Sequence, residues 1–220
     1  MKSKIKSNML TGVLCIFAFS VWTVLMMITD IQPIGVNDSN VGFATINSWF
    51  NKLTGTDMIL YNITDWLGLV TLLVCFLFAA LGFIQLINRK SFRKVDADII
   101  ALGVFYIIIL LCYLVFEMIP INYRPILING YAENSYPSST TLLVLSVMPT
   151  LAFQAKMRFK SVCCIKLIYT VTIMFSLFMV IGRLISGVHW LTDIVGSILL
   201  SSGMFYIYKS IVYMLFEKRS

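Results

Sequence analysis

The chain has 220 residues, of which 59% are hydrophobic and only 12% are charged, and its net charge is +7. Soluble domains carry about 25% charged residues, so this composition excludes a soluble class and favours a polytopic membrane protein. The basic residues form short clusters between apolar stretches rather than a stripe interleaved with aromatic residues, so we expect no nucleic-acid partner.

Six continuous apolar stretches predict the framework of the chain. An α-helix rises 1.5 Å per residue, so about 20 residues cross a hydrocarbon core of ~30 Å. We therefore predict an all-α integral membrane protein, a six-transmembrane-helix bundle that forms a single domain over residues 1–220. The helices are expected at residues 9–28, 66–87, 99–119, 141–155, 167–185 and 194–216.

The first outer loop, residues 30–65, contains an amphipathic pattern. Its apolar residues recur at three- and four-residue spacing, which predicts a short helix. They are Phe43, Ile46, Trp49, Phe50 and Leu53. Such a helix either lies in the outer membrane interface or packs on the bundle, and the spacing favours neither arrangement.

The distribution of Lys and Arg predicts how the chain lies in the membrane. Fourteen of the 17 basic residues fall on one side, at the termini, in the second and fourth connections and, for Lys209, toward the end of the last stretch, whereas only Lys52, Arg124 and Arg183 fall on the other side. Cytoplasmic loops carry the excess of Lys and Arg, so both termini are expected in the cytoplasm of a bacterial cell, with an active site at the outer face of its plasma membrane. No small-residue cleavage site precedes Asp30, so we expect the first helix to be retained.

The most informative polar cluster consists of Arg183, His189 and Asp193, at the expected outer ends of the last two helices. His189 and Asp193 are four residues apart, so on a helix start they share a face and the carboxylate can bond one imidazole nitrogen. That bond would fix the tautomer and leave the other nitrogen as a nucleophile or base. Arg183 supplies a planar fork of donors for phosphate oxygens.

Two further outer patches complete a candidate phosphate site. Pro137 begins a turn before the fourth stretch, where backbone N–H groups and the hydroxyls of Ser138 and Ser139 can bind an anion or simply cap the helix. Arg124, after the third stretch, can reach a second edge of the phosphate. Together the three patches suit phosphoryl transfer, which mostly needs positioning and stabilisation of charge.

The order and spacing of these residues resemble the type 2 phosphatidic-acid phosphatase superfamily of membrane lipid phosphatases, which is related to vanadium haloperoxidases. The motifs run from Glu117, separated by six residues from Arg124-Pro125, through Pro137-Ser138-Ser139-Thr140, to Gly182-Arg183, His189 and Asp193. The resemblance implies that His189 attacks phosphorus to form a phosphohistidine and that Asp193 orients it. It also implies that the two arginines, with the backbone at Ser138 and Ser139, hold the phosphate oxygens.

Three positions depart from the family pattern. Gly182 replaces a serine, Glu117 replaces a phosphate-binding lysine, and Thr140 replaces a second histidine that, in that family, protonates the leaving group and later activates water. A threonine hydroxyl does not titrate near neutral pH, so Thr140 and Glu117 are accessory candidates. Glu117 could donate the proton or pair with Arg124, and we favour the pairing. Without an acid, a lipid diphosphate is a better substrate than an alkyl phosphate, because its leaving group is less basic.

The leading hypothesis is a phosphatase that hydrolyses a lipid phosphate or diphosphate of isoprenoid-carrier or glycerophospholipid type. The alternatives are a phosphotransferase that uses the same intermediate and, because of Thr140, a non-catalytic lipid-phosphate binder. We expect no cofactor and no metal ion, because the sequence has one histidine and no metal-ligand or nucleotide-binding motif. The expected partners are the lipid substrate and the bilayer, and the sequence does not indicate an oligomeric state.

Overall fold

The computed structural model describes residues 1–217, and among them all regular structure is helical, with no β-sheet. The helices are α1 (Lys2–Ile28), α2 (Ala44–Thr54), α3 (Met58–Arg89), α4 (Ala97–Met118), α5 (Ser139–Arg158), α6 (Val162–Ile185) and α7 (Leu191–Glu217), with short 3₁₀ turns η1 (Val36–Asp38) and η2 (Phe92–Lys94).

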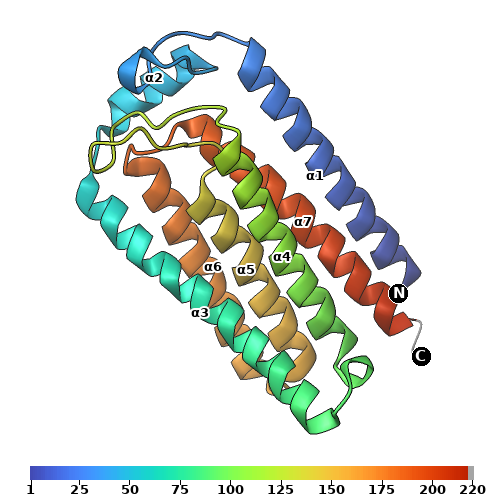
Figure 1. Ribbon diagram of the computed structural model, residues 1–220. Coiled ribbons are helices and arrows are strands. Elements are labelled where there is room, and N and C mark those ends of the chain that lie inside the picture. Colours follow the sequence, from blue (N-terminus) through green and yellow to red (C-terminus); the bar gives the residue numbers. More distant parts are fainter. Residues whose placement is uncertain (218–220) are drawn as a thin grey trace.

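Six of these helices, α1 and α3 to α7, are long and apolar enough to cross a membrane, which confirms the all-α, six-helix expectation. They form one bundle in which the start of α1 and the end of α7 lie at one end and α2 lies at the other (Figure 1). Helix α5 is the least apolar of the six and has the largest share of its residues buried. It packs against α3, α4, α6 and α7, so its polar residues face protein rather than lipid.

Helix α3 begins eight residues before the apolar stretch that predicted it. Asp57 is its N-cap, and the carboxylate accepts from the N–H groups of Ile59 and Leu60 at 2.9 and 3.0 Å. The outer loop therefore ends at Asp57 rather than at residue 65. As a result Tyr61 and Asp65 belong to the first two turns of a spanning helix, where they face the polar cluster described below.

Helix α2 is the amphipathic helix expected in the outer loop, and it packs on the bundle. Its polar face packs on the bundle, where Asn47 is fully buried and bonds to the first turn of α7. Its apolar side chains Ile46, Trp49 and Leu53 are exposed. Helix α2 thus fixes the loop before α7 while presenting an apolar surface outward.

Candidate functional site

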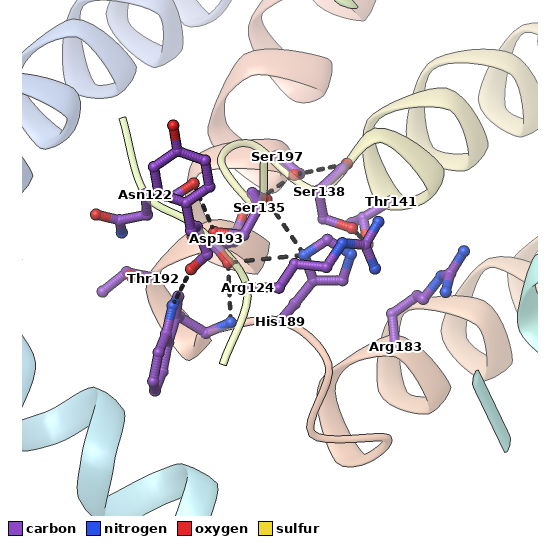
Figure 2. A network of polar contacts seen from close by, with 12 residues as sticks. Asn122, Arg124, Ser135, Ser138, Thr141, Arg183, His189, Thr192, Asp193 and Ser197 are labelled. Carbon is purple, nitrogen blue, oxygen red and sulfur yellow. Dashed lines mark hydrogen bonds and ion pairs between the residues drawn. The ribbon is translucent and has the colours of Figure 1, made fainter. Parts of the chain in front are cut away.

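The polar residues predicted to act together do gather at the α2 end of the bundle. Arg183 lies in the last turn of α6, His189 in the loop between α6 and α7, Asp193 in the first turn of α7, and Arg124 in the loop after α4 (Figure 2). All four side chains are buried, and Arg183 is only 1% exposed. Four ionisable groups held out of water require compensating partners, so their neighbours define what the site can bind.

His189 is held by a backbone carbonyl as well as by a carboxylate. Its Nδ1 lies 3.2 Å from the carbonyl oxygen of Ser135, whereas the Asp193 Oδ2 atom is 3.6 Å away. The Ser135 carbonyl is therefore the hydrogen-bond partner of Nδ1, and the Asp193 carboxyl that was expected to bond the ring lies just beyond hydrogen-bonding distance of the same nitrogen. A carbonyl oxygen can only accept, so Nδ1 carries the proton and Nε2 keeps its lone pair. Nε2 is buried and has no hydrogen-bond partner.

The surroundings of His189 keep the imidazole neutral. Burial first, and then the positive charges of Arg124 and Arg183, lower the pKa of His189 well below its ordinary value, and the bond to Ser135 offsets this only in part. A neutral imidazole with a free Nε2 lone pair is the form that can act as a nucleophile.

Asp193 also builds the start of α7. Its Oδ2 accepts from the backbone N–H of Trp190 at 2.8 Å, the reciprocal half of a capping box. The next donor of this turn, the N–H of Thr192, reaches Asn47 of α2 at 3.3 Å. The loop that carries His189 is thus held by the Asp193 carboxylate of α7 and by two side-chain amides of α2, Asn47 and Asn51.

Arg124 and Arg183 approach each other over one aromatic ring. Their guanidinium carbons lie 5.6 and 4.7 Å from the ring centroid of Tyr61. Arg124 forms an ion pair at 3.2 Å with Glu133, which also accepts the Arg124 backbone N–H through its carbonyl. The predicted pairing of Arg124 with Glu117 is therefore wrong, because the loop folds back and brings Glu133 closer.

The remaining nitrogens of the two arginines converge as unused donors. Nε and Nη1 of Arg124 and Nε and Nη1 of Arg183 are buried and have no hydrogen-bond partner. Buried donors without acceptors are costly, typically ~1–3 kcal/mol each or more when charged. The positive charges of both arginines act on His189, and guanidinium donors of this kind are the partners that phosphate oxygens require.

At the start of α5, the hydroxyl of Ser138 is bonded within the protein, whereas Ser139 lines a cavity. The Ser138 hydroxyl donates to Thr141 at 3.1 Å, and its backbone N–H is directed at the carbonyl of Asp193, 3.4 Å away. Ser138 is therefore occupied by the packing of α5 on α7. No side chain caps the first turn of α5, so the N–H groups after Ser138 remain available for an anion, with Ser139 on the cavity wall.

Asp65 of α3 is a site residue that the sequence did not reveal. Its Oδ1 accepts from Nη2 of Arg183 at 2.6 Å, and the same nitrogen donates to the hydroxyl of Thr140. The sequence feature that could have indicated Asp65 is its position directly before an apolar stretch, because ionisable residues near a membrane core are often functional. It was assigned to the outer loop, since nothing in the sequence placed it beside α6.

Two cavities open on this cluster. One of about 230 Å³ lies between the end of α4 and the start of α5 and is lined by Glu117, Arg124, Glu133 and Ser139 among others. The second, of about 480 Å³, is a mainly apolar groove between α3, α4 and α5. Asp65, Ser139 and Thr140 line one end of it, and because Asp65 and Thr140 both bond to Arg183 the groove meets the arginine cluster there.

The fold and the site together define a helical membrane protein with a buried, cationic, histidine-containing site at one end. The model of the PAP2 superfamily matches residues 119–217, a segment that contains Arg124, Arg183, His189 and Asp193. The matched segment is thus similar to the PAP2 superfamily, the phosphatidic-acid phosphatase family that its motifs resemble.

A crystal structure of a transmembrane PAP2-type phosphatidylglycerolphosphate phosphatase from Bacillus subtilis has the same fold. It superposes with a TM-score of 0.62 and 16% sequence identity, covering 93% of this chain and 97% of that one. The comparison with curated proteins found no match. Across residues 1–217 no group of three or more His, Cys, Asp or Glu side chains is placed to hold a metal ion.

Proposed function

We propose that this protein is a membrane phosphatase that removes phosphate from a lipid phosphate or diphosphate through a phosphohistidine at His189. The observation that carries the proposal is the unpartnered Nε2 of His189, buried beside four unpartnered nitrogens of Arg124 and Arg183. Similarity to the PAP2 superfamily and the shared fold of a PAP2-type lipid phosphatase support lipid phosphate as the substrate class.

In the proposed first step, Nε2 of His189 attacks the terminal phosphorus. The leaving group, a lipid monophosphate from a diphosphate substrate or a lipid alkoxide from a monoester, departs with the electron pair of the broken phosphorus–oxygen bond. Negative charge grows on the phosphoryl oxygens, where the free donors of Arg124 and Arg183 neutralise it in a site that excludes water. Ser135 keeps the proton on Nδ1, so Nε2 retains its lone pair for the attack. In the second step water breaks the phosphorus–Nε2 bond and releases orthophosphate.

The lipid chain of the substrate fits the groove between α3, α4 and α5. The groove is mainly apolar, opens along the faces of spanning helices, and meets the arginine cluster at Thr140. Thr140 cannot protonate a leaving oxygen, so a diphosphate, whose leaving group is less basic, is the preferred class over an alkyl monoester. Rates of phosphate release from isoprenoid and from diacylglycerol substrates decide which type of lipid tail the groove accepts.

The test is phosphate release over a panel of lipid phosphates and diphosphates in detergent or liposomes, with His189→Ala as the inactive control. We expect diphosphates to turn over faster than monoesters, and radioactive phosphate from the substrate to remain on wild-type protein but not on His189→Ala. A product in which the phosphate has moved to an added alcohol would indicate transfer rather than hydrolysis. Release that persists in His189→Ala would rule out the phosphohistidine.

A lipid-phosphate binder without turnover is the second candidate. It is favoured by one observation: Thr140 hydrogen-bonds to Arg183 instead of offering a titratable group. A binder would show saturable binding of the same lipids, dependent on Arg124, with no labelled histidine and no released phosphate. The panel experiment therefore separates the two candidates directly.

We further propose that both termini face the cytoplasm of a bacterial cell and that the site faces outward. The first turn of α6, at the end of the bundle opposite the site, carries the exposed residues Cys163 and Cys164. In intact cells or right-side-out vesicles, a membrane-impermeant maleimide should label neither, and in inverted vesicles it should label both. Labelling in intact cells would reverse the proposed orientation.

A further inference from the structure

We propose that Asp65 is the catalytic base of the second step, taking a proton from the water that hydrolyses the phosphohistidine. This inference rests on the proposed function and assigns the proton transfer that Thr140 cannot perform. It names a residue on α3, outside the segment that matches the family model, residues 119–217.

The position of Asp65 is defined by Arg183. One nitrogen of that guanidinium, Nη2, donates both to Asp65 Oδ1, at 2.6 Å, and to the hydroxyl of Thr140. The carboxylate therefore lies beside Thr140, at the position where the resemblance predicts a histidine. Its oxygen Oδ1 is committed to Arg183, which leaves Oδ2 as the atom that can accept a proton.

The exposure of the pair suits this role. Arg183 is 1% exposed and Asp65 is 58% exposed by side chain, so the carboxylate links the buried arginine to water. Asp65, Thr140 and Ser139 also line the groove assigned to the lipid chain. Water that enters the groove after the lipid product has left therefore meets the Asp65 carboxylate.

The close approach of α3 depends on Gly182. A Cβ atom at Gly182 would lie 2.7 Å from Cγ2 of Thr64 and 3.6 Å from Cδ1 of Leu60, so a side chain there would force Thr64 or α3 to shift. The residues that follow on the two helices, Asp65 and Arg183, form the ion pair. Two departures from the family pattern thus have one explanation. Gly182 lets α3 approach α6, and Thr140 shares the guanidinium of Arg183 with the Asp65 carboxylate.

The water oxygen forms a bond to phosphorus while the phosphorus–Nε2 bond breaks and its electron pair returns to His189. The water proton passes to Oδ2 of Asp65 and then to solvent. The products are orthophosphate and neutral His189, ready for another turnover. An ionised carboxylate suits this half of the cycle, and the diphosphate leaving group makes an acid unnecessary in the first half.

A purely structural role for Asp65 makes a different prediction. If Asp65 only positioned Arg183, its loss would weaken phosphate binding and slow both steps. If it is the base, the first step proceeds and the intermediate accumulates. The two roles are separated by measuring the two steps individually.

The experiment is rapid-quench kinetics with a lipid diphosphate carrying a radioactive terminal phosphate, on wild type, Asp65→Asn and the exposed-carboxylate control Asp38→Asn. The asparagine side chain keeps an oxygen for Arg183 and loses the base. We expect Asp65→Asn to form phosphohistidine in a burst at the wild-type rate and to turn over ~10²–10⁴-fold more slowly. Asp38→Asn should match wild type.

Two results would overturn the assignment of Asp65: wild-type turnover in Asp65→Asn, or a burst that slows in proportion to turnover in a variant whose unfolding temperature in detergent is unchanged. If Asp65→Asn does not fold, Asp65→Glu replaces it. Its carboxylate retains the base but extends one methylene further, so a slowed second step with a normal burst is expected, and an equal slowing of both steps contradicts the proposal. Absence of any phosphohistidine in wild type would instead refute the proposed function, and this inference with it.

Discussion

Asn47 of α2 holds the loop that carries His189, so its removal is expected to lower both stability and turnover. Its amide nitrogen donates to the carbonyl of Gly42 and to the hydroxyl of Thr192, each at 2.9 Å, and its oxygen accepts from the backbone N–H of Thr192 at 3.3 Å. Asn47 is fully buried, so water cannot readily replace these partners after substitution by alanine. The N–H of Thr192 lies in the first turn of α7, where a helix offers no acceptor of its own.

The expected magnitude follows from the bonds that are lost. A capping side chain and two further hydrogen bonds are worth about 1 kcal/mol each, so Asn47→Ala should lower the free energy of unfolding by roughly 3 kcal/mol. Asn51 is a matched control on the same helix, with a single bond to the carbonyl of Gly187 at 3.0 Å. Asn51→Ala should cost about 1 kcal/mol.

The effect on turnover follows from the position of Thr192 next to Asp193. Loss of the Asn47 anchor frees the start of α7, and a displacement of ~1 Å at a reacting group can slow a reaction ~10²-fold. Denaturant unfolding in detergent micelles gives the stability difference, and phosphate release at a temperature where both variants are folded gives the rate. If Asn47→Ala unfolds at the same denaturant concentration as Asn51→Ala and retains the wild-type rate, α2 does not position His189.

Two further predictions concern the same loop. A Cβ at Gly187, where φ is +68°, would lie 1.7 Å from the carbonyl oxygen of Gly55, so Gly187→Ala should prevent recovery of folded protein in detergent. Gly130→Ala, at φ +83° with no atom within 4 Å, should cost only backbone strain of roughly 1–2 kcal/mol and remain recoverable. The folded site lowers the pKa of His189 below its ordinary value of 6.5. As the pH falls below 6.5, the imidazole of His189 is therefore protonated in the unfolded chain but stays neutral in the folded chain. Stability should therefore fall by up to ~1.4 kcal/mol per pH unit in that range, and this component should be absent above it and in His189→Gln.

Each of these predictions has a clear contrary outcome. Equal yields of the two glycine variants would show that the loop at Gly187 can move away from Gly55 at little cost. Identical pH dependence of unfolding in wild type and His189→Gln would show that His189 is not held neutral by burial and the two arginines. Both measurements need no substrate, so they test the site independently of the proposed function.

Much of the architecture could be predicted from the sequence because the bilayer imposes simple rules. Continuous apolar stretches of about 20 residues must become helices in lipid, since no water is available to satisfy the backbone. The structure confirms all six, and the amphipathic spacing after Phe43 correctly indicated α2. The motif around His189 and Asp193 pointed to the PAP2 superfamily because its residues follow each other closely in the chain and share a short turn.

The partners of these residues could not be predicted, since they come from segments far away in sequence. Asp65 is separated from Arg183 by 118 positions, and Asn47 from Thr192 by 145. Glu133 rather than Glu117 pairs with Arg124 because of how the loop after α4 folds back. Hydropathy and local spacing carry no information on which helices approach closely enough for such contacts.

The sequence by itself determined that the chain forms six helices apolar enough to span a membrane and that it carries the motif around His189 and Asp193, because lipid and local geometry constrain those features residue by residue. Only the tertiary structure decided how that site is completed. The carbonyl of Ser135 sets the tautomer of His189, and both arginines stack on the ring of Tyr61. Gly182 leaves room for α3, so Asp65 forms an ion pair with Arg183. These contacts depend on close packing between distant helices, and packing is a property of the folded bundle rather than of any one segment.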